Sequence, residues 1–204
     1  MLISDLHPWG VTYKEAVKIQ KDLKDKVSLK KIDKRIKYVA GLDVSYAKGS
    51  NFPSLNKAEE RWSQKKVSFP YIPGLLSFRE IPALIDALRK MEIEPDLIFC
   101  DGQGILNKST IGCAKSPLVG TYSQVGESKG NYAYLIHQNR IIGAVVRTRS
   151  KVKPIFVSPG YGVMLNDCVT FVLETCSKYR IPEPTRQAHL LVNSVRSRKL
   201  SGPI

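Results

Sequence analysis

Residues 38–46 read YVAGLDVSY and predict a β-strand. Side chains alternate between the two faces of a strand, so Gly41, Asp43 and Ser45 share one face. That face is small and leaves room above the sheet. Aspartate is depleted in strands, and no local cap accounts for Asp43. The stretch therefore predicts a strand that carries a functional carboxylate.

A second strand is predicted at residues 97–100, where LIFC precedes Asp-Gly-Gln-Gly. A short continuous apolar run is typical of a strand covered on both faces. Asp101 would stand at its carboxyl end, where open α/β sheets bind their ligands, and the glycines after it allow a ligand to approach closely. The alternative is that Asp101 caps the following turn, because Asp-Gly is a common turn signal.

The remaining pattern mixes helices with strands and predicts one α/β domain over residues 1–204. Thr12 and Glu15 form a capping box that begins a helix over 12–26. Further helices are predicted after the 69–74 loop, over 164–178 and from Pro184, with strands at 110–114, 141–147 and 155–157. Buried strands at 97–100 and 110–114 would be parallel neighbours, yet parallel neighbours need a crossover of a dozen or more residues. Only 101–109 separates them, so either the two strands are not parallel neighbours or a crossover helix is absent from this chain.

The charge of the chain points to a polyanionic partner. Thirty-two Lys and Arg stand against 18 Asp and Glu, a formal net charge of +14, and such an excess most often serves nucleic-acid binding. Residues 128–166 contain no Asp or Glu, and the tail from Ser177 contains Glu183 alone. Basic side chains such as Arg147 are therefore predicted to gather on one face.

Other classes of protein are excluded by the same composition. No run of about 18 apolar residues is present, so we expect no membrane span, and the first residues do not form a signal peptide. Four cysteines without Cys-x-x-Cys spacing argue against a zinc ribbon or a disulfide scaffold. Free thiols fit a reducing, cytoplasmic setting, and we expect a monomer.

Glu80 adds a third carboxylate just after the stiff loop FPYIPG at 69–74. Carboxylate oxygens are the ligands that Mg²⁺ prefers, one or two to each ion, so three of them suit a one- or two-metal phosphodiester site. There the metal activates the attacking water. Two alternatives remain for Glu80: the third residue of a capping box begun by Ser77, or an ion-pair partner of Arg79.

Tyr71 is held between two prolines and can act as an aromatic wedge that unstacks bases. A core tyrosine is the alternative. Lys115 follows a predicted strand and either touches a phosphate or is solvated. Three lone histidines lack metal-ligand spacing and are predicted to be structural: His7, His137 and His189.

With these residues in place, the chain resembles the endonuclease V family, the deoxyinosine 3′-endonucleases. The matching stretches run in family order across most of the chain: YVAGLDVSYA (38–47), FPYIPGLLSFRE (69–80), PDLIFCDGQGI (95–105), STIGCAKSPLVG (109–120), PIFVSPG (154–160) and RIPEPTRQAH (180–189). PYIPGLLSFRE and DGQG together are highly specific.

The resemblance implies an RNase H-like fold, in which helices flank a mixed central sheet. It also implies a Mg²⁺-dependent nuclease of nucleic-acid repair, in which Mn²⁺ can substitute. Such enzymes bind DNA that contains deoxyinosine, or RNA that contains inosine. They nick on the 3′ side, one nucleotide beyond the lesion, and leave 3′-hydroxyl and 5′-phosphate ends.

The resemblance also assigns roles to particular residues. The metal-binding carboxylates match Asp43, Glu80 and Asp101, and the active-site lysine matches Lys115. The strand-separating wedge matches Tyr71 with its neighbours Pro70, Ile72 and Pro73. The walls of the hypoxanthine pocket match Gly74, Leu75 and Gly112.

The chain departs from the family at three places. Tyr161 follows Ser-Pro-Gly where the family carries a catalytic histidine, and a tyrosine does not titrate near neutral pH. An apolar strand is missing near 47–52 and a helix near 105–106. Two other functions therefore stay open: a structure-selective RNase H-like nuclease, and a non-catalytic nucleic-acid-binding protein in which Tyr161 marks lost activity.

Overall fold

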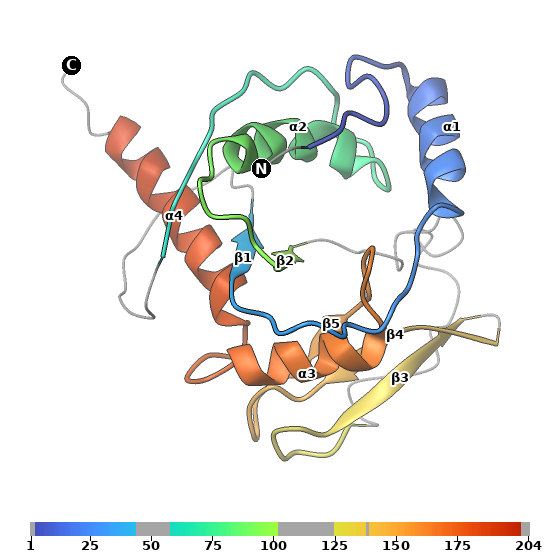
Figure 1. Cartoon of the computed structure of the whole chain (residues 1–204), viewed down its shortest axis with the longest axis vertical. Helices are drawn as coiled ribbons and strands as arrows, with labels where there is room; N and C mark the ends of the chain where they lie inside the picture. Colours follow the sequence, from blue (N-terminus) through green and yellow to red (C-terminus); the bar gives the residue numbers. More distant parts are fainter. Residues whose placement is uncertain (1–2, 44–57, 102–124, 138, 201–204) are drawn as a thin grey trace. The chain divides into compact units, whose positions relative to one another are not determined.

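The computed structural model describes residues 3–43, 58–101, 125–137 and 139–200, with side chains up to 197. The described elements are a mixture of helices and strands, as the sequence predicts for an α/β protein. They are α1 (Tyr13–Lys24), β1 (Val39–Leu42), α2 (Leu76–Arg89), β2 (Leu97–Cys100), β3 (Tyr132–His137), β4 (Arg140–Val146), β5 (Ile155–Val157), α3 (Leu165–Thr175) and α4 (Glu183–Leu200) (Figure 1).

The chain divides into two compact units. The first consists of Met1–Asp22, Ile36–Asp101 and Pro184–Ile204, and the second of Leu23–Arg35 and Gly102–Glu183. All three carboxylates that the sequence singles out belong to the first unit.

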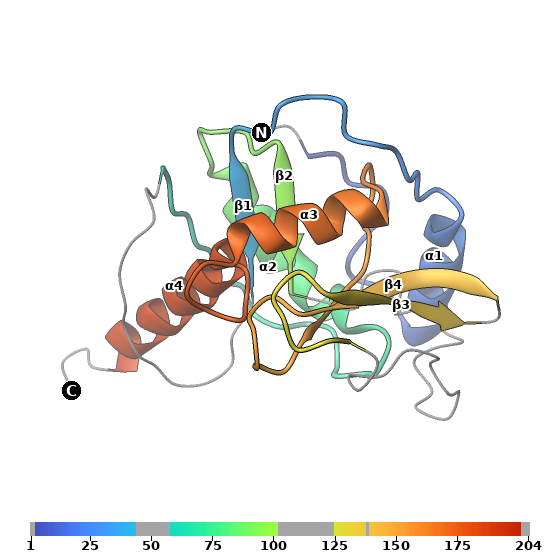
Figure 2. The same ribbon diagram turned by 90° about the horizontal axis from the view of Figure 1, so that it is seen from below.

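The first unit is built on β1 and β2, which pair in parallel (Figure 2). Their register runs from Val39 opposite Leu97 to Leu42 opposite Cys100. Asp96 sets this register, because its carboxylate accepts the N–H groups of Lys37 and Tyr38 at 2.9 and 3.0 Å. The strand predicted over 38–46 is thus confirmed for Val39–Leu42, while 44–46 lie outside the described residues. Asp43 follows the strand directly, so its predicted place in the middle of a strand was wrong.

β2 is not covered on both faces, and this prediction from its apolar run was wrong. Burial alternates along the strand, with Ile98 and Cys100 exposed on one face. Within the described part of the chain β2 has β1 as its only sheet neighbour. An apolar run is therefore compatible with a strand that has one open face.

A small aromatic core joins α1, the 69–75 loop and α2. The buried residues of this core are Ala16, Phe69, Leu75 and Phe78. Helix α1 begins at the predicted capping box: the Thr12 N–H donates to Glu15 Oε2 at 2.8 Å, and the Glu15 N–H donates to Thr12 Oγ1 at 3.4 Å. The loop that carries Tyr71 is therefore held in place by its packing against α1 and α2.

The room predicted above the small face of β1 is filled by α4, which passes beside β1 (Figure 1). The backbone of Pro184, in the first turn of α4, lies directly against Gly41. The expectation of open space above this face was therefore wrong: the missing side chain at position 41 admits a helix backbone.

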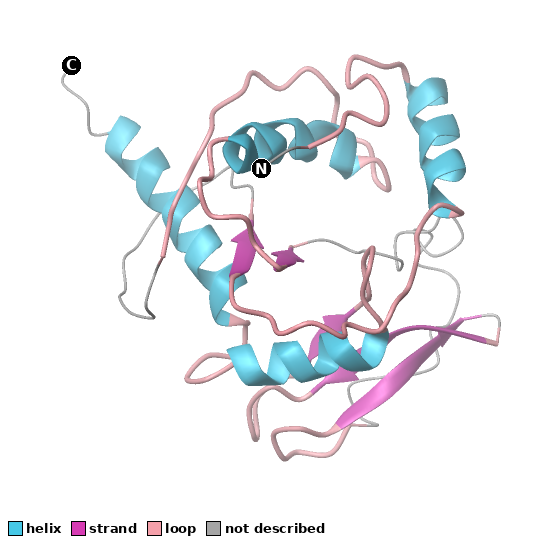
Figure 3. Ribbon diagram, viewed as in Figure 1, coloured by secondary structure: helices cyan, strands magenta, loops and turns pink. Residues whose placement is uncertain are grey.

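The second unit contains the antiparallel sheet β3–β4–β5, and α3 contacts β4 and β5 (Figure 3). Its core includes Leu135 and Val145, both fully buried. The strands predicted at 141–147 and 155–157 are confirmed, and the strand predicted at 110–114 lies outside the described residues. β3 was not predicted from the sequence.

Arg147 was predicted to belong to a basic surface, and the structure buries it instead, leaving 9% exposed. Its guanidinium donates to three backbone carbonyl oxygens: those of Gly126 at 3.0 Å, Val152 at 2.6 Å and Val125 at 2.9 Å. The side chain therefore clamps two loops of the second unit. A lack of nearby acids in the sequence does not imply a free cation, because carbonyl oxygens accept from arginine equally well.

Two further expectations from the sequence concern membrane-spanning helices and the state of the cysteines. None of the helices in the described part is long and apolar enough to cross a membrane. The cysteines described there, Cys100, Cys168 and Cys176, are all free thiols. Burial raises the pKa of Cys168 and of Cys176 to about 11, so both remain protonated at neutral pH.

Candidate active site

Asp43 and Asp101 stand together at the carboxyl edge of the parallel pair. Each is the first residue after its strand, and the preceding residues Leu42 and Cys100 are register partners. The pairing continues one step further, because the Asp101 N–H donates to the Leu42 carbonyl oxygen at 3.2 Å. Neighbouring strands lie about 4.8 Å apart. The structure therefore brings two of the predicted carboxylates to one edge.

Glu80 reaches the same group of charges from α2. Its pKa is raised, first by partial burial and then by the negative charges of Asp43 and Asp101, while Arg79 acts in the opposite direction. Repulsion of this kind requires the three carboxylates to lie within electrostatic reach of one another. The third predicted carboxylate is therefore electrostatically coupled to the other two.

Neither alternative for Glu80 describes its surroundings. The residue before α2 is Leu75, which makes no side-chain capping bond, and Ser77 lies inside the helix. A capping box from Ser77 is therefore wrong. Arg79 donates through Nη1 to the Phe69 carbonyl oxygen at 3.1 Å and is the weakest of the influences on the Glu80 pKa.

His189 joins this site although the sequence predicted a structural role for it. Its Nδ1 lies 2.7 Å from Oδ2 of Asp43. The Asp43 side chain is 7% exposed and the His189 side chain 60% exposed. An ionised carboxylate only accepts hydrogen bonds, so Nδ1 carries the proton and Nε2 is left for other partners.

The contact joins residues 146 positions apart, which explains why spacing did not reveal it. The available signal was the stretch RIPEPTRQAH, which ends at His189 and is one of the stretches that match the family. His189 was therefore a candidate site residue on the same ground as the acids, because it too lies in a stretch that matches the family.

The donor set fits a divalent cation by its chemistry. Within the described residues no Lys or Arg forms an ion pair with Glu80 or Asp101. Hard carboxylate oxygens are the ligands that Mg²⁺ prefers. In the same part of the chain no three His, Cys, Asp or Glu side chains converge tightly enough to enclose an ion.

The PYIP loop, residues 70–73, exposes Tyr71 to solvent between two buried residues. Phe69 and Leu75, on either side of the loop, are 4% and 3% exposed. The ring of Phe69 lies 5.5 Å from that of Phe78, and the Leu75 N–H donates to the Ile72 carbonyl oxygen at 3.0 Å. Tyr71 itself is 69% exposed, so the alternative of a core tyrosine is wrong.

The end of this loop depends on a glycine. Gly74 has φ of 85°, in the left-handed region that favours glycine. Its carbonyl oxygen accepts from Gln20 Nε2 at 2.8 Å. The Leu75 side chain is packed in the core beside Phe78, so only main-chain atoms of Leu75 are free to contact a bound base.

The other predicted site residues lie elsewhere. Lys115 and Gly112 fall outside the described residues. Tyr161 belongs to the second unit, where it is 78% exposed in a turn before α3.

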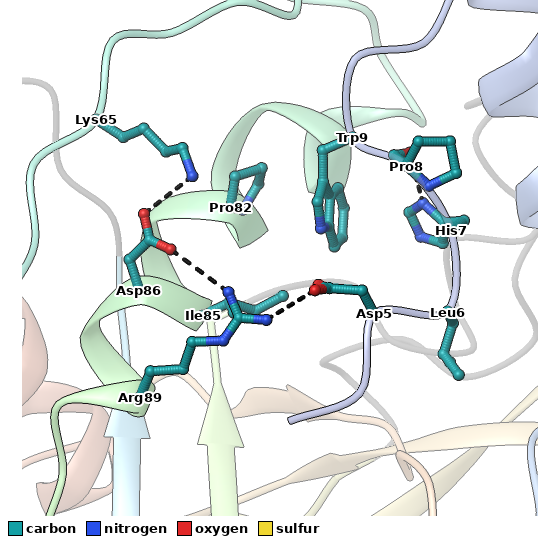
Figure 4. Close-up of a pocket in the computed structure, with 10 residues that line it drawn as sticks. All are labelled: Asp5, Leu6, His7, Pro8, Trp9, Lys65, Pro82, Ile85, Asp86 and Arg89. Atoms are coloured by element: carbon teal, nitrogen blue, oxygen red, sulfur yellow. Dashed lines mark hydrogen bonds and ion pairs between the residues drawn. The ribbon is translucent and has the colours of Figure 1, made fainter. Parts of the chain in front are cut away.

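A cavity of about 470 Å³ lies away from the carboxylates, beside α2 and the N-terminal segment (Figure 4). Its charges neutralise one another: Arg89 pairs with Asp5 at 2.9 Å, and Lys65 with Asp86 at 2.9 Å. Figure 4 shows these pairs beside Trp9. We therefore place the candidate chemistry at the edge where Asp43, Asp101 and Glu80 lie within electrostatic reach of one another, and not in this cavity.

Comparison with protein families identifies one match. The family model described as endonuclease V matches residues 21–190, which include Asp43, Glu80, Asp101 and His189. Similar curated proteins are the endonucleases V of Trichormus variabilis, 42% identical over 95% of this chain and 100% of its own length, and of Petrotoga mobilis, 38% identical over 97% and 100%. Both alignments exceed the 204 residues of the chain, so these relatives contain residues that it lacks.

Solved structures give the same result for the fold. Endonuclease V from Streptomyces avermitilis is 30% identical, with a TM-score of 0.75 over 95% of this chain and 96% of its own. Endonuclease V from Ciona intestinalis, in complex with a 23-mer DNA containing an inosine followed by a ribo-adenosine, is 24% identical, with a TM-score of 0.71 over 93% and 100%. The expected RNase H-like fold is confirmed by these neighbours. On the family match and the curated relatives together, the chain belongs to the endonuclease V family.

Proposed function

We propose that the chain is a Mg²⁺-dependent endonuclease that nicks DNA on the 3′ side of deoxyinosine, one nucleotide beyond the lesion, and that it accepts inosine in RNA. Family membership supports the reaction class. The inosine-containing DNA bound by the Ciona intestinalis relative supports the choice of substrate. The observation that carries the proposal is the coupling of Glu80 to the Asp43–Asp101 pair at the carboxyl edge.

Asp43 and Asp101 would hold the cation, with Glu80 contributing an oxygen directly or through water. Mg²⁺, when bound, lowers the pKa of the attacking water and stabilises charge on the phosphate; Mn²⁺ can take its place. Without a cation the chain keeps three acids within reach of one another, an arrangement that costs energy at neutral pH. That cost favours cation binding over the empty site.

His189 would accept a proton at this site. Donation from Nδ1 to Asp43 fixes the plane of the ring, and a neutral imidazole then offers the Nε2 lone pair. With 60% of its side chain exposed, His189 can accept a proton from the attacking water. Tyr161, which stands where the family has another histidine, is not needed for this step.

Substrate binding would begin with the phosphate backbone, through the excess of basic side chains. Tyr71 would part the strands beside the lesion, since an exposed ring on a stiff, anchored loop can insert between bases without an ordering cost. The altered base would leave the stack, as enzymes that inspect a base usually require. Main-chain atoms of Gly74 and Leu75 would then form one wall of its pocket.

A nicking assay tests the proposal. The substrates are matched DNA duplexes, and matched RNAs, that differ only in adenosine or inosine at one position, incubated with Mg²⁺ or with EDTA. We expect metal-dependent nicking of the inosine strand alone, one nucleotide to the 3′ side. Equal nicking of both duplexes would favour a structure-selective nuclease, and binding without nicking would favour a non-catalytic protein.

A further inference from the structure

Gly41 and His189 are connected through α4. Gly41 lies two residues before Asp43, so its missing side chain would point from the same face of the strand. A methyl group at position 41 would overlap the carbonyl group of Pro184 and lie 2.7 Å from the Thr185 nitrogen. The first turn of α4 therefore sits on the strand backbone itself, at a distance that no side chain allows.

The same helix carries His189, which donates to Asp43 at 2.7 Å. Pro184 and His189 are five residues apart, about 7.5 Å along a helix. Gly41 and Asp43 are two residues apart, about 6.7 Å along a strand. The helix thus contacts this segment at two points: a backbone contact at Gly41 and a hydrogen bond at Asp43.

We propose that Gly41 is a positioning residue of the active site: because it lacks a side chain, α4 can seat on β1 and hold the His189 imidazole against Asp43. The proposal rests on the function proposed above for this site. A larger residue at position 41 would move α4 outward and break the His189–Asp43 bond without touching either side chain.

The chain offers a matched control in Gly143. It also lies on a strand, and a Cβ there would approach the Val157 carbonyl oxygen to 2.5 Å. Gly143 belongs to β4 in the second unit, and its position carries no proposed role in catalysis. Gly41→Ala and Gly143→Ala therefore impose the same kind of backbone clash, but only the first is placed to disturb His189.

The test is a double-mutant cycle on unfolding, which needs no nuclease activity. The coupling between Asp43→Ala and His189→Ala, each of which removes the bond, is measured in three backgrounds: the parent chain, Gly41→Ala and Gly143→Ala. We expect a coupling of about fivefold or more in the unfolding constant of the parent, the same value with Gly143→Ala, and none with Gly41→Ala. An undiminished coupling with Gly41→Ala would overturn the proposal.

If Gly41→Ala does not fold, a second variant tests the same proposal. One alanine inserted between Arg186 and Gln187 leaves the seat at Pro184 intact and turns His189 by about 100° around the helix. We expect the coupling to vanish. Its survival would mean that the helix shifts freely on β1, which contradicts a fixed seat. If the parent chain shows the coupling but nicks no substrate, the proposed function fails while the role of Gly41 stands.

Discussion

Asp43 and Asp101 occupy equivalent positions, each one residue beyond the end of its strand in a hydrogen-bonded parallel pair. The pKa of Glu80 is raised first by its partial burial and then by the negative charges of Asp43 and Asp101. The site therefore concentrates negative charge at the sheet edge, and the predictions below follow from that charge and from the groups around it.

Asp43→Asn removes a charge but keeps an oxygen that can accept from His189. We expect kcat for inosine nicking to fall by about a hundredfold or more, as losses of charge-stabilising groups do. Nucleic-acid affinity should stay equal or rise slightly, because one repulsive charge is gone. Single-turnover nicking and a gel-shift titration measure the two quantities.

Glu94→Gln is the control for this substitution, since Glu94 is an exposed carboxylate away from the edge. Its kcat should match the parent value. Full activity of Asp43→Asn would remove Asp43 from the proposed chemistry.

Glu80→Gln should change stability in a pH-dependent way. The pKa of Glu80 is raised in the folded state, so the folded chain holds this proton more tightly than the unfolded chain does. The stability that this proton provides is present below the unfolded value of about 4.5 and is lost as the pH rises through the folded pKa. Glu80→Gln should therefore stabilise the fold at pH 7 and have little effect at pH 4.

Urea unfolding at the two pH values, with and without Mg²⁺, measures this effect. Mg²⁺ should stabilise the parent chain more than the variant, because it relieves the same repulsion. If Glu80→Gln were less stable than the parent at pH 7, the charge of Glu80 would not be destabilised by burial and by the neighbouring aspartates.

Tyr71→Ala should weaken action on duplexes with little cost to folding. Stacking of one base on an aromatic ring is worth about 1–3 kcal/mol, so kcat/KM on an inosine duplex should fall about tenfold or more. The loss should be smaller on single-stranded substrate, which needs no strand separation. Because Tyr71 is 69% exposed, the unfolding free energy should change by less than about 0.5 kcal/mol.

Tyr71→Phe should retain most of the activity, since the ring is kept. Tyr13→Ala, at another largely exposed tyrosine, should leave kcat/KM unchanged on both substrates. Equal losses on duplex and single strand for Tyr71→Ala would contradict a wedge.

The strands that precede Asp43 and Asp101 could be predicted from the sequence because their signals are local, whereas the role of the acids stays a prediction. An aspartate in a strand-like stretch and an aspartate that follows an apolar run are visible from their immediate neighbours. The parallel pairing places Asp43 and Asp101 together with no further information. The exposed position of Tyr71 likewise follows from the prolines that hold its loop.

The remainder depends on contacts between distant segments, which periodicity does not encode. The bond from His189 to Asp43 exists because α4 packs on β1. β3 was missed although YAYLIH alternates as a strand should. Arg147 was assigned to the surface from its charge alone, and only the loops around it show that it is a clamp.

Arg147→Lys tests that last correction. Lysine cannot reproduce the planar fork that donates to three carbonyl oxygens, so we expect a loss of about 2 kcal/mol or more in unfolding free energy. The salt dependence of nucleic-acid binding should not change. Arg149→Lys, at an exposed neighbour, should alter stability by less than about 0.5 kcal/mol. A changed salt dependence with unchanged stability would return Arg147 to the binding surface.

The central claim is that Asp43, Asp101 and Glu80 share a divalent cation. Crystals grown with Mn²⁺, measured for anomalous scattering at the manganese edge, locate that ion directly. We predict an anomalous peak at the carboxyl edge of β1 and β2, within coordination distance of Asp43 and Asp101 and within reach of Glu80. No peak there, or manganese bound only at other sites, would contradict the account.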